Sequence, residues 1–216
     1  RKGNRMKNIF AIIERETKAY FFSPMAYVLI LFFIFLSGMA YVFFAFQSHQ
    51  AELSGIVGFM STLILFLSPL ITMRLFAEER RTGTLEVLLT CPVTETEVVV
   101  GKFGSAVLTL IIMLALTAHY PLFLFLFGNP DKGPLWTGYV GLVLLGSCYL
   151  SIGLLASSLA KNQIVAAVLA FGVCLILLIL SAFSSFVTGN IGDTFKYLSF
   201  YDHFEDFIRG VIDTKH

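Results

Sequence analysis

Five long stretches of the chain contain no Asp, Glu, Lys or Arg, and short charged segments separate them. The charge-free stretches are residues 19–51, 53–73, 103–130, 133–160 and 162–192. A helix of about 20 apolar residues crosses the roughly 30 Å hydrocarbon core of a bilayer. An ionised side chain at mid-span costs about 2.5–3.5 kcal/mol, which explains the absence of charge. The pattern predicts five transmembrane helices, near residues 25–46, 56–75, 99–127, 135–160 and 164–187.

Composition agrees with this pattern and excludes an ordinary soluble domain. Hydrophobic residues make up 57% of the 216 residues and charged residues 13%, against about 25% charged in typical soluble domains. The net charge of +1 gives no sign of nucleic-acid binding. The three cysteines are far apart and lack metal-ligand spacing. We therefore interpret them as reduced, small hydrophobic residues and expect no metal site.

Both ends of the chain are amphipathic. Residues 1–23 hold six of the fifteen Lys and Arg residues among isoleucines and aromatic residues, and Glu14 and Lys18 form a favourable i, i+4 pair. We expect a helix that lies on the membrane surface. It is not a cleavable signal peptide, because no short apolar run ends in a small-residue cleavage site. Residues 188–216 place Phe, Ile and Val at helical spacing against acidic residues, which predicts a second amphipathic segment.

The distribution of positive charge orients the predicted spans. With a cytoplasmic N-terminus, the segments on that side hold eleven of the fifteen Lys and Arg residues, and the opposite segments hold four. Loops rich in Lys and Arg stay in the cytoplasm. The rule therefore places residues 1–23, 76–98 and 161–163 in the cytoplasm and the tail at 188–216 outside. The eleven are Arg1, Lys2, Arg5, Lys7, Arg15, Lys18, Arg74, Arg80, Arg81, Lys102 and Lys161.

Residues 76–98 form the only dense cluster of charge between two long apolar runs. Two helix breaks divide this segment. Gly83 is the first, and Pro92, which cannot donate a helix hydrogen bond, is the second. Thr94 with Glu97 three residues later is the sequence of a capping box and predicts the start of a new helix.

The stretch between the two breaks, residues 84–90, has room for barely two helical turns. Leu85, Leu88 and Leu89 lie on one side of such a helix and Glu86 on the other. An ordinary polar loop between two membrane helices is one interpretation of the segment. An ordinary loop does not require a short leucine-rich helix between two helix breaks. We therefore favour the interpretation that residues 84–90 form a docking surface for a soluble partner.

A resemblance to a known family rests on this segment. It reads Phe76-Ala-Glu-Glu-Arg-Arg-Thr-Gly-Thr-Leu-Glu-Val-Leu-Leu-Thr-Cys-Pro-Val and is followed by Gly101-Lys102-Phe103. In order and spacing it resembles the signature of ABC-2 type transporter permeases, closest to the gliding-motility-associated subgroup. In that family the segment is the coupling helix that sits on the ATPase subunit. An elbow helix precedes the first span, and a sixth span follows the region where this sequence ends.

The resemblance implies a fold, a function and partners. The fold is an all-α polytopic ABC-2 type transmembrane domain, a single domain over residues 1–216. The function is that of a permease subunit in an exporter of a bacterial inner membrane. The implied partners are a cytoplasmic ABC ATPase subunit, a second permease copy or a similar chain, and membrane lipid. ATP and Mg²⁺ bind the ATPase, and no cofactor binds this chain.

The resemblance also assigns site residues. The ATPase-coupling residues are Glu78, Glu79, Arg80, Arg81, Gly83, Thr84, Leu85, Glu86, Leu88, Leu89 and Pro92. A second cytoplasmic contact with the ATPase is expected at Lys161, Asn162 and Gln163.

The motifs of enzymes are missing from the sequence. Gly101-Lys102 is followed by Phe103 rather than Ser or Thr, and it lacks the spaced first glycine of a phosphate loop. We therefore expect neither catalysis nor ATP binding by the chain itself. His119, in the third apolar run, is a candidate proton relay, but the spans offer no acidic partner, which favours a neutral histidine. The alternative function is a non-transporting membrane anchor or scaffold for a cytoplasmic complex.

Small residues line two of the predicted spans. The fourth carries Gly146, Ser147, Ser151, Gly153, Ser157 and Ser158, and the fifth carries Ala166, Ala170 and Cys174. Such stripes let helices approach closely in lipid. A subunit interface or a translocation path is one interpretation, and packing within one bundle is the other, which the spacing by itself favours.

Overall fold

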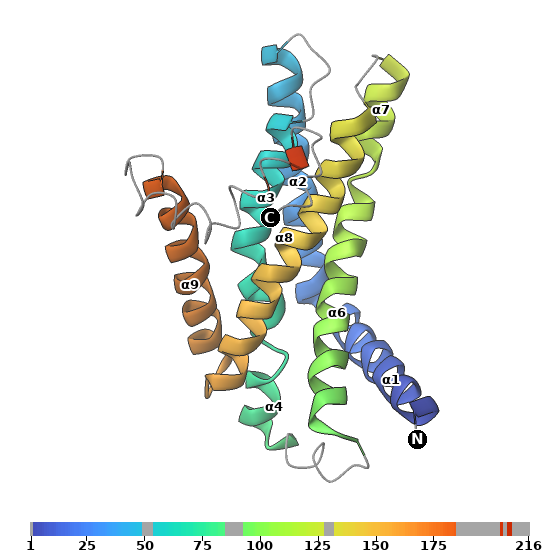
Figure 1. Cartoon of the computed structure of the whole chain (residues 1–216), viewed down its shortest axis with the longest axis vertical. Coiled ribbons are helices and arrows are strands. Elements are labelled where there is room, and N and C mark those ends of the chain that lie inside the picture. Colours follow the sequence, from blue (N-terminus) through green and yellow to red (C-terminus); the bar gives the residue numbers. More distant parts are fainter. Residues whose placement is uncertain are drawn as a thin grey trace.

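Long apolar helices that run antiparallel dominate the computed structural model of the chain (Figure 1). The structure describes residues 2–48, 54–84, 93–127, 132–184, 204 and 207–208. Within these ranges it contains helices and no strand. The helices are α1 (Lys2–Phe21), α2 (Pro24–Ser48), α3 (Ser54–Thr72), α4 (Ala77–Thr82), α6 (Glu95–Leu116), α7 (His119–Phe127), α8 (Lys132–Leu159) and α9 (Gln163–Ser184).

Five stretches of the described chain are long and apolar enough to cross a membrane, each with a mean hydropathy of 2.0 or more. They are Pro24–Phe44, Ser54–Thr82, Glu95–Leu126, Gly133–Leu159 and Gln163–Ser181. This confirms the five predicted spans and the all-α fold class. The predicted amphipathic N-terminal segment forms a helix, α1, in which Lys18 Nζ lies 2.6 Å from Glu14 Oε1.

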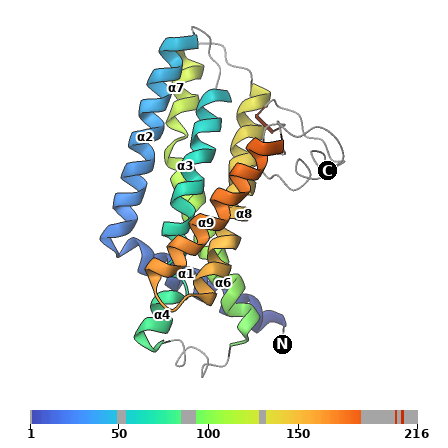
Figure 2. The same cartoon turned by 90° about the vertical axis from the view of Figure 1, so that its left-hand side faces the viewer.

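The direction of the helices gathers several short elements at one end of the bundle. α2, α6 and α9 run one way along the bundle, and α3 and α8 run the other way (Figures 1 and 2). As a result α1, α4, the start of α6 and the turn between α8 and α9 share one end, which we call the α4 end. The far ends of α2 and α7 lie at the opposite end. Residues that the positive-inside rule assigns to the cytoplasm therefore lie together.

The core is built around α3, which packs against α2, α8 and α9. Its Leu65, together with Phe33 of α2 and Leu142 and Leu150 of α8, is completely buried. Large apolar residues of α2, among them Phe35, stay exposed. An exposed apolar face on a spanning helix is what contact with lipid tails requires.

The helix of the second span is interrupted near its predicted end. It was expected to reach residue 75, but α3 stops at Thr72, and a turn leads into a separate helix, α4, at Ala77. In this turn the Leu75 N–H donates to the Thr72 carbonyl at 3.1 Å, a tighter spacing than that of an α-helix. The physical reason is the tertiary anchoring of α4, described below.

The third span, predicted as one helix over 99–127, is interrupted at Thr117 and Ala118. The N–H groups of Thr117, Ala118 and Tyr120 donate to carbonyls three residues back, at 3.0–3.1 Å. Pro121 explains the break, because it has no N–H and its ring clashes with the carbonyl four residues earlier, that of Thr117. The chain then continues as α7. Across the break, His119 Nδ1 of α7 lies 2.7 Å from the Leu116 carbonyl at the end of α6.

Three of the six small residues of α8, Gly146, Gly153 and Ser157, pack inside the bundle, whereas Ser151 is exposed. A Cβ at Gly146 would lie 3.2 Å from Ile64 of α3 and would press on Leu110 of α6. At Gly153 it would collide with the side chain of Thr72, whose Cβ would be 2.9 Å away. In α9, the stripe that contains Cys174 is buried as well. These contacts support the interpretation of packing within one bundle.

The predicted amphipathic tail at 188–216 lies almost entirely outside the described residues. Of its described residues, Phe204 is buried, and it packs with Phe207 against α8 at Gly141, where an added Cβ would lie 2.9–3.0 Å from the two side chains.

Gly153→Ala should destabilise the bundle by roughly 1–3 kcal/mol, because the new methyl group has no space against Thr72. Gly172→Ala in α9 is the matched control, since nothing lies within 4 Å of its added Cβ. Alanine is also the better helix former by about 1 kcal/mol. The measurement is thermal unfolding of the detergent-solubilised chain. Equal stability of the two variants would contradict the close packing of α3 on α8.

Candidate functional site

The first turn of α4 is capped by a serine from another helix. The N–H groups of Phe76 and Ala77 donate to Ser157 Oγ of α8 at 3.1 and 3.2 Å, and that hydroxyl donates to the Met73 carbonyl at 3.2 Å. Phe76, at the N-cap position, makes no side-chain cap of its own. The first N–H groups of a helix have no partner within the helix, so Ser157 supplies what the local sequence lacks. α4 is thereby fastened to α8.

Small side chains bring α4 close to the turn between α8 and α9. Ala77, Ala160 and Ala166 form one buried cluster, with Met73 packed against it. In the same turn Asn162 begins α9, since its Oδ1 accepts the Val165 N–H at 2.8 Å. The described start of the predicted coupling segment, at Ala77, therefore lies against the turn that holds the second predicted ATPase contact, residues 161–163.

A buried lysine joins α4 to two further helices. Lys102 of α6, only 1% exposed, places its Nζ 2.9 Å from Glu79 Oε1 of α4 and 3.3 Å from Glu16 Oε1 of α1. Its ammonium also lies 5.2 Å from the centre of the Phe76 ring, within cation–π range. Arg15 of α1 lies 3.5 Å from Glu79 and 3.7 Å from Glu16. We call Arg15, Glu16, Glu79 and Lys102 the charge cluster.

The charge cluster has to be complete to be stable. A buried charge is tolerated when opposite charges and hydrogen bonds compensate its loss of water, and removal of one partner costs about 3–5 kcal/mol. Here two positive and two negative groups from three helices compensate one another. The cluster therefore fixes the position of α4 relative to α1 and α6.

Contacts further along α1 hold it on α6. A Cβ at Gly101 would lie 2.6 Å from Ile12, and one at Gly104 would lie 2.8 Å from Ile13, so both glycines allow a close approach of the two helices. At the start of α6, Glu97 Oε2 accepts the Thr94 N–H at 3.0 Å, and the Thr94 hydroxyl accepts the Glu97 N–H at 3.4 Å. This confirms the predicted capping box.

Comparison with known proteins identifies the family. The family model described as ABC-2 family transporter protein matches residues 10–215. The chain belongs to the ABC-2 transporter family. It is a multi-pass membrane protein of the permease type, and five stretches of its described residues are long and apolar enough to cross a membrane. Comparison with curated proteins gave no match.

The described residues among those predicted to couple to an ATPase differ in exposure. Glu79 is largely buried in the charge cluster, whereas Arg80, Arg81 and Thr84 are exposed. Glu78 lies 3.8 Å from Arg74, one turn earlier. Gly83 ends α4 with a φ of 72°, a left-handed conformation that favours glycine, and this confirms the first predicted break. The remaining residues of the set, Leu85, Glu86, Leu88, Leu89 and Pro92, lie outside the described residues.

The second predicted contact is also on the surface. Lys161 and Asn162 are exposed and Gln163 is half-buried. These residues share the α4 end with Arg80 and Arg81. Among the described residues of the permease, no group of three His, Cys, Asp or Glu side chains is arranged to hold a metal ion.

Sequence analysis did not predict the contacts of Ser157 and Lys102 with α4. Ser157 was noted as a small residue of a stripe, and Lys102 as a cytoplasmic positive charge in the Gly101-Lys102-Phe103 motif. One sequence feature could have identified Lys102: it directly precedes the long charge-free run at residues 103–130. A lysine there either reaches water or needs buried acidic partners.

Ser157→Ala should loosen α4 without disturbing the spans. Loss of a helix cap costs about 1 kcal/mol, which corresponds to roughly fivefold more frequent opening. The measurement is the rate of tryptic cleavage after Arg80 and Arg81, followed by mass spectrometry. Ser158→Ala is the matched control, because the Ser158 hydroxyl bonds only to Leu155 of its own helix. Equal cleavage rates in the two variants would show that the cap does not hold α4.

Proposed function

We propose that the permease works with a separate cytoplasmic ATPase subunit and couples ATP hydrolysis to export of a substrate. ATP and Mg²⁺ belong to the ATPase, and this chain contributes the membrane path and the docking surface. The observation that carries the proposal is the double attachment of α4, to α8 by Ser157 and to α1 and α6 by the charge cluster.

Because of this attachment, α4 and the helices that hold it are expected to move together. A displacement of α4 relative to α8 would break the hydrogen bonds of Ser157, and a displacement relative to α6 would leave Lys102 or Glu79 buried without a partner. Both changes are costly. A push on residues 84–92 is therefore passed to several spans at once, in line with rigid-body transitions of packed elements.

The exposed charges of the α4 end supply a surface for the ATPase. Arg80 and Arg81 project from α4, and Lys161 projects from the neighbouring turn. Such a positive surface fits an acidic rim on the ATPase, which would speed association and set its orientation. The leucines of residues 84–90 supply the apolar part of the contact, where interface energy concentrates.

Orientation and assembly follow from charge and family. Eleven of the fifteen Lys and Arg residues fall on the α4 side, which supports a cytoplasmic N-terminus in a bacterial inner membrane. A second permease copy, or a similar chain, completes the transporter, as the family implies. The likeness to the gliding-motility-associated subgroup rests on the residues of the coupling segment alone.

Leu88→Asp tests the docking surface. A buried anchor typically contributes about 2 kcal/mol or more, and a carboxylate buried without a partner costs further energy. The variant should insert into the membrane normally and lose the ATPase in a pull-down from mild detergent, normalised to permease level. Glu86→Ala, on the opposite face of the expected helix, is the control and should retain the ATPase.

Two outcomes would count against the proposal. Full retention of the ATPase by Leu88→Asp would remove the leucine face as the docking surface. An ATPase that binds the wild-type permease but hydrolyses ATP at the same rate with and without it would favour the scaffold alternative.

A further inference from the structure

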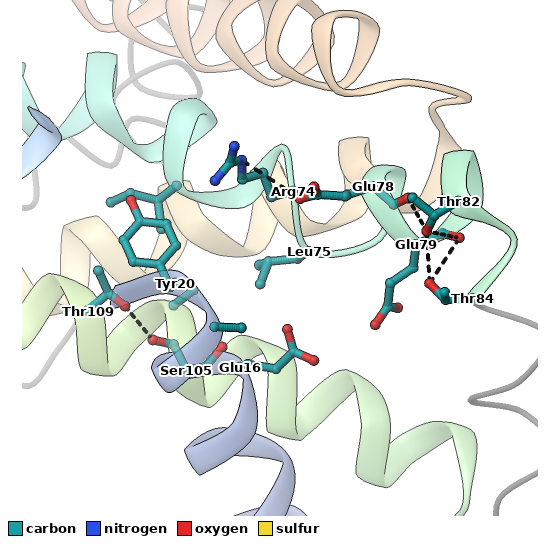
Figure 3. A pocket seen from close by; sticks show the side chains of 13 residues that line it. Glu16, Tyr20, Arg74, Leu75, Glu78, Glu79, Thr82, Thr84, Ser105 and Thr109 are labelled. Carbon is teal, nitrogen blue, oxygen red and sulfur yellow. Dashed lines mark hydrogen bonds and ion pairs between the residues drawn. The ribbon is translucent and has the colours of Figure 1, made fainter. Parts of the chain in front are cut away.

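A cavity of about 290 Å³ lies at the α4 end, between α1, the α3–α4 segment and α6. Figure 3 shows Tyr20 and Thr109 on one side of it and Glu79 on the other. Arg74 lies along one wall, and Glu16 lies along the wall facing it. The volume is at the lower limit of ligand pockets, about 300 Å³, so a small polar group fits and a whole lipid does not.

Several polar atoms around the cavity are buried without a hydrogen bond. They are Tyr20 Oη, Glu79 Oε2 and Arg74 Nε. Arg74 Nη1 donates a hydrogen bond to Ser23 Oγ at 2.7 Å, and Arg74 Nε lies 3.8 Å from Glu78 Oε2, close enough for an ion pair but too far for a hydrogen bond. Buried polar atoms are nearly always paired in folded proteins, so three unpaired atoms around one cavity indicate a missing partner.

The unpaired groups include both hydrogen-bond donors and a hydrogen-bond acceptor, so they require partners of opposite charge. The Tyr20 hydroxyl and the Arg74 guanidinium donate hydrogen bonds and suit an anion. Burial raises the pKa of Tyr20, so the phenol keeps its proton at neutral pH and acts as a donor. Glu79 Oε2 and the half-exposed Glu78 accept hydrogen bonds and suit a cation. Charge-assisted hydrogen bonds of both kinds are the strong ones.

The total charge around the cavity favours a ligand that is itself neutral. Its described lining contains three carboxylates, on Glu16, Glu78 and Glu79, and one guanidinium, on Arg74. Lys102 and Arg15 pair with the carboxylates of Glu16 and Glu79. With these two positive charges, the three carboxylates and Arg74, the formal charge around the cavity sums to zero. A simple cation or anion would leave a net charge in a largely buried site, whereas a zwitterion would not.

The cavity lies at the depth of lipid head groups. Tyr20 is near the end of the surface helix α1, just before the first span, and Arg74 is the first charged residue after the second apolar run. We propose that the cavity binds an ammonium–phosphate zwitterion, the phosphoethanolamine head group of a membrane phospholipid. The phosphate contacts Arg74 and Tyr20, and the ammonium contacts Glu78 and Glu79.

Lipid binding to the delipidated full-length permease in detergent tests this proposal. Native mass spectrometry and thermal unfolding would compare phosphatidylethanolamine, phosphatidylglycerol and soluble phosphoethanolamine. Phosphatidylethanolamine should bind most tightly and raise the unfolding temperature. Equal binding of phosphatidylglycerol, which has a phosphate and no amine, would overturn the proposal. Equal protection by soluble phosphoethanolamine at the same concentration would overturn the assignment to a lipid.

Two substitutions locate the site. Tyr20→Phe removes only the unpaired hydroxyl and should weaken phosphatidylethanolamine binding roughly tenfold, because a hydrogen bond to a charged group is lost. Its unfolding temperature without lipid should match that of the wild type, since no protein hydrogen bond is broken. Arg74→Gln should weaken binding at least as much. Tyr27→Phe and Arg81→Gln, at exposed positions outside the cavity, are the controls. Unchanged affinity in both cavity variants would overturn the proposal.

Discussion

The position of one buried ammonium group, that of Lys102, determines how the α4 end of the permease is assembled. The group lies inside the protein at the edge of an apolar span, where an unpaired charge would be costly. The carboxylates of Glu79 on α4 and Glu16 on α1 compensate the positive charge of Lys102. If either helix moved away from α6, a buried charge would lose its partner or become exposed to water. α4, at the start of the predicted coupling segment, and α1 are therefore linked through one side chain.

The opposite side of α4 is held by close contact rather than by charge. Ser157 completes its first turn, and Ala77 packs against Ala160 and Ala166, where larger side chains would not fit. The cavity next to Arg74 and Tyr20 lies on the other side of α4, facing α1 and α6, and is lined by Glu16 and Glu79 of the charge cluster. A head group bound there would touch α1, α4 and the end of α3 together, and the surrounding lipid would then influence the elements that we propose the ATPase to move.

Features set by local chemistry could be predicted from the sequence, and features set by distant partners could not. The spans follow from the absence of charge, the break at Gly83 from its conformational freedom, and the cap at Thr94 from its spacing to Glu97. The break at Thr117 could have been inferred from Pro121. By contrast, Ser157 caps a helix whose first residues lie 80–81 positions away, and no local pattern signals that contact.

A double-mutant cycle on Lys102 and Glu79 is the most direct test of this account. Lys102→Met, Glu79→Gln and the double variant would be compared by reversible unfolding in bicelles. The account predicts an interaction energy of about 1–3 kcal/mol for this buried pair, against about 0.3–0.5 kcal/mol for the exposed pair of Lys18 and Glu14. Additive effects at Lys102 and Glu79, within about 0.5 kcal/mol, would contradict the claim that this ion pair holds α4 in place.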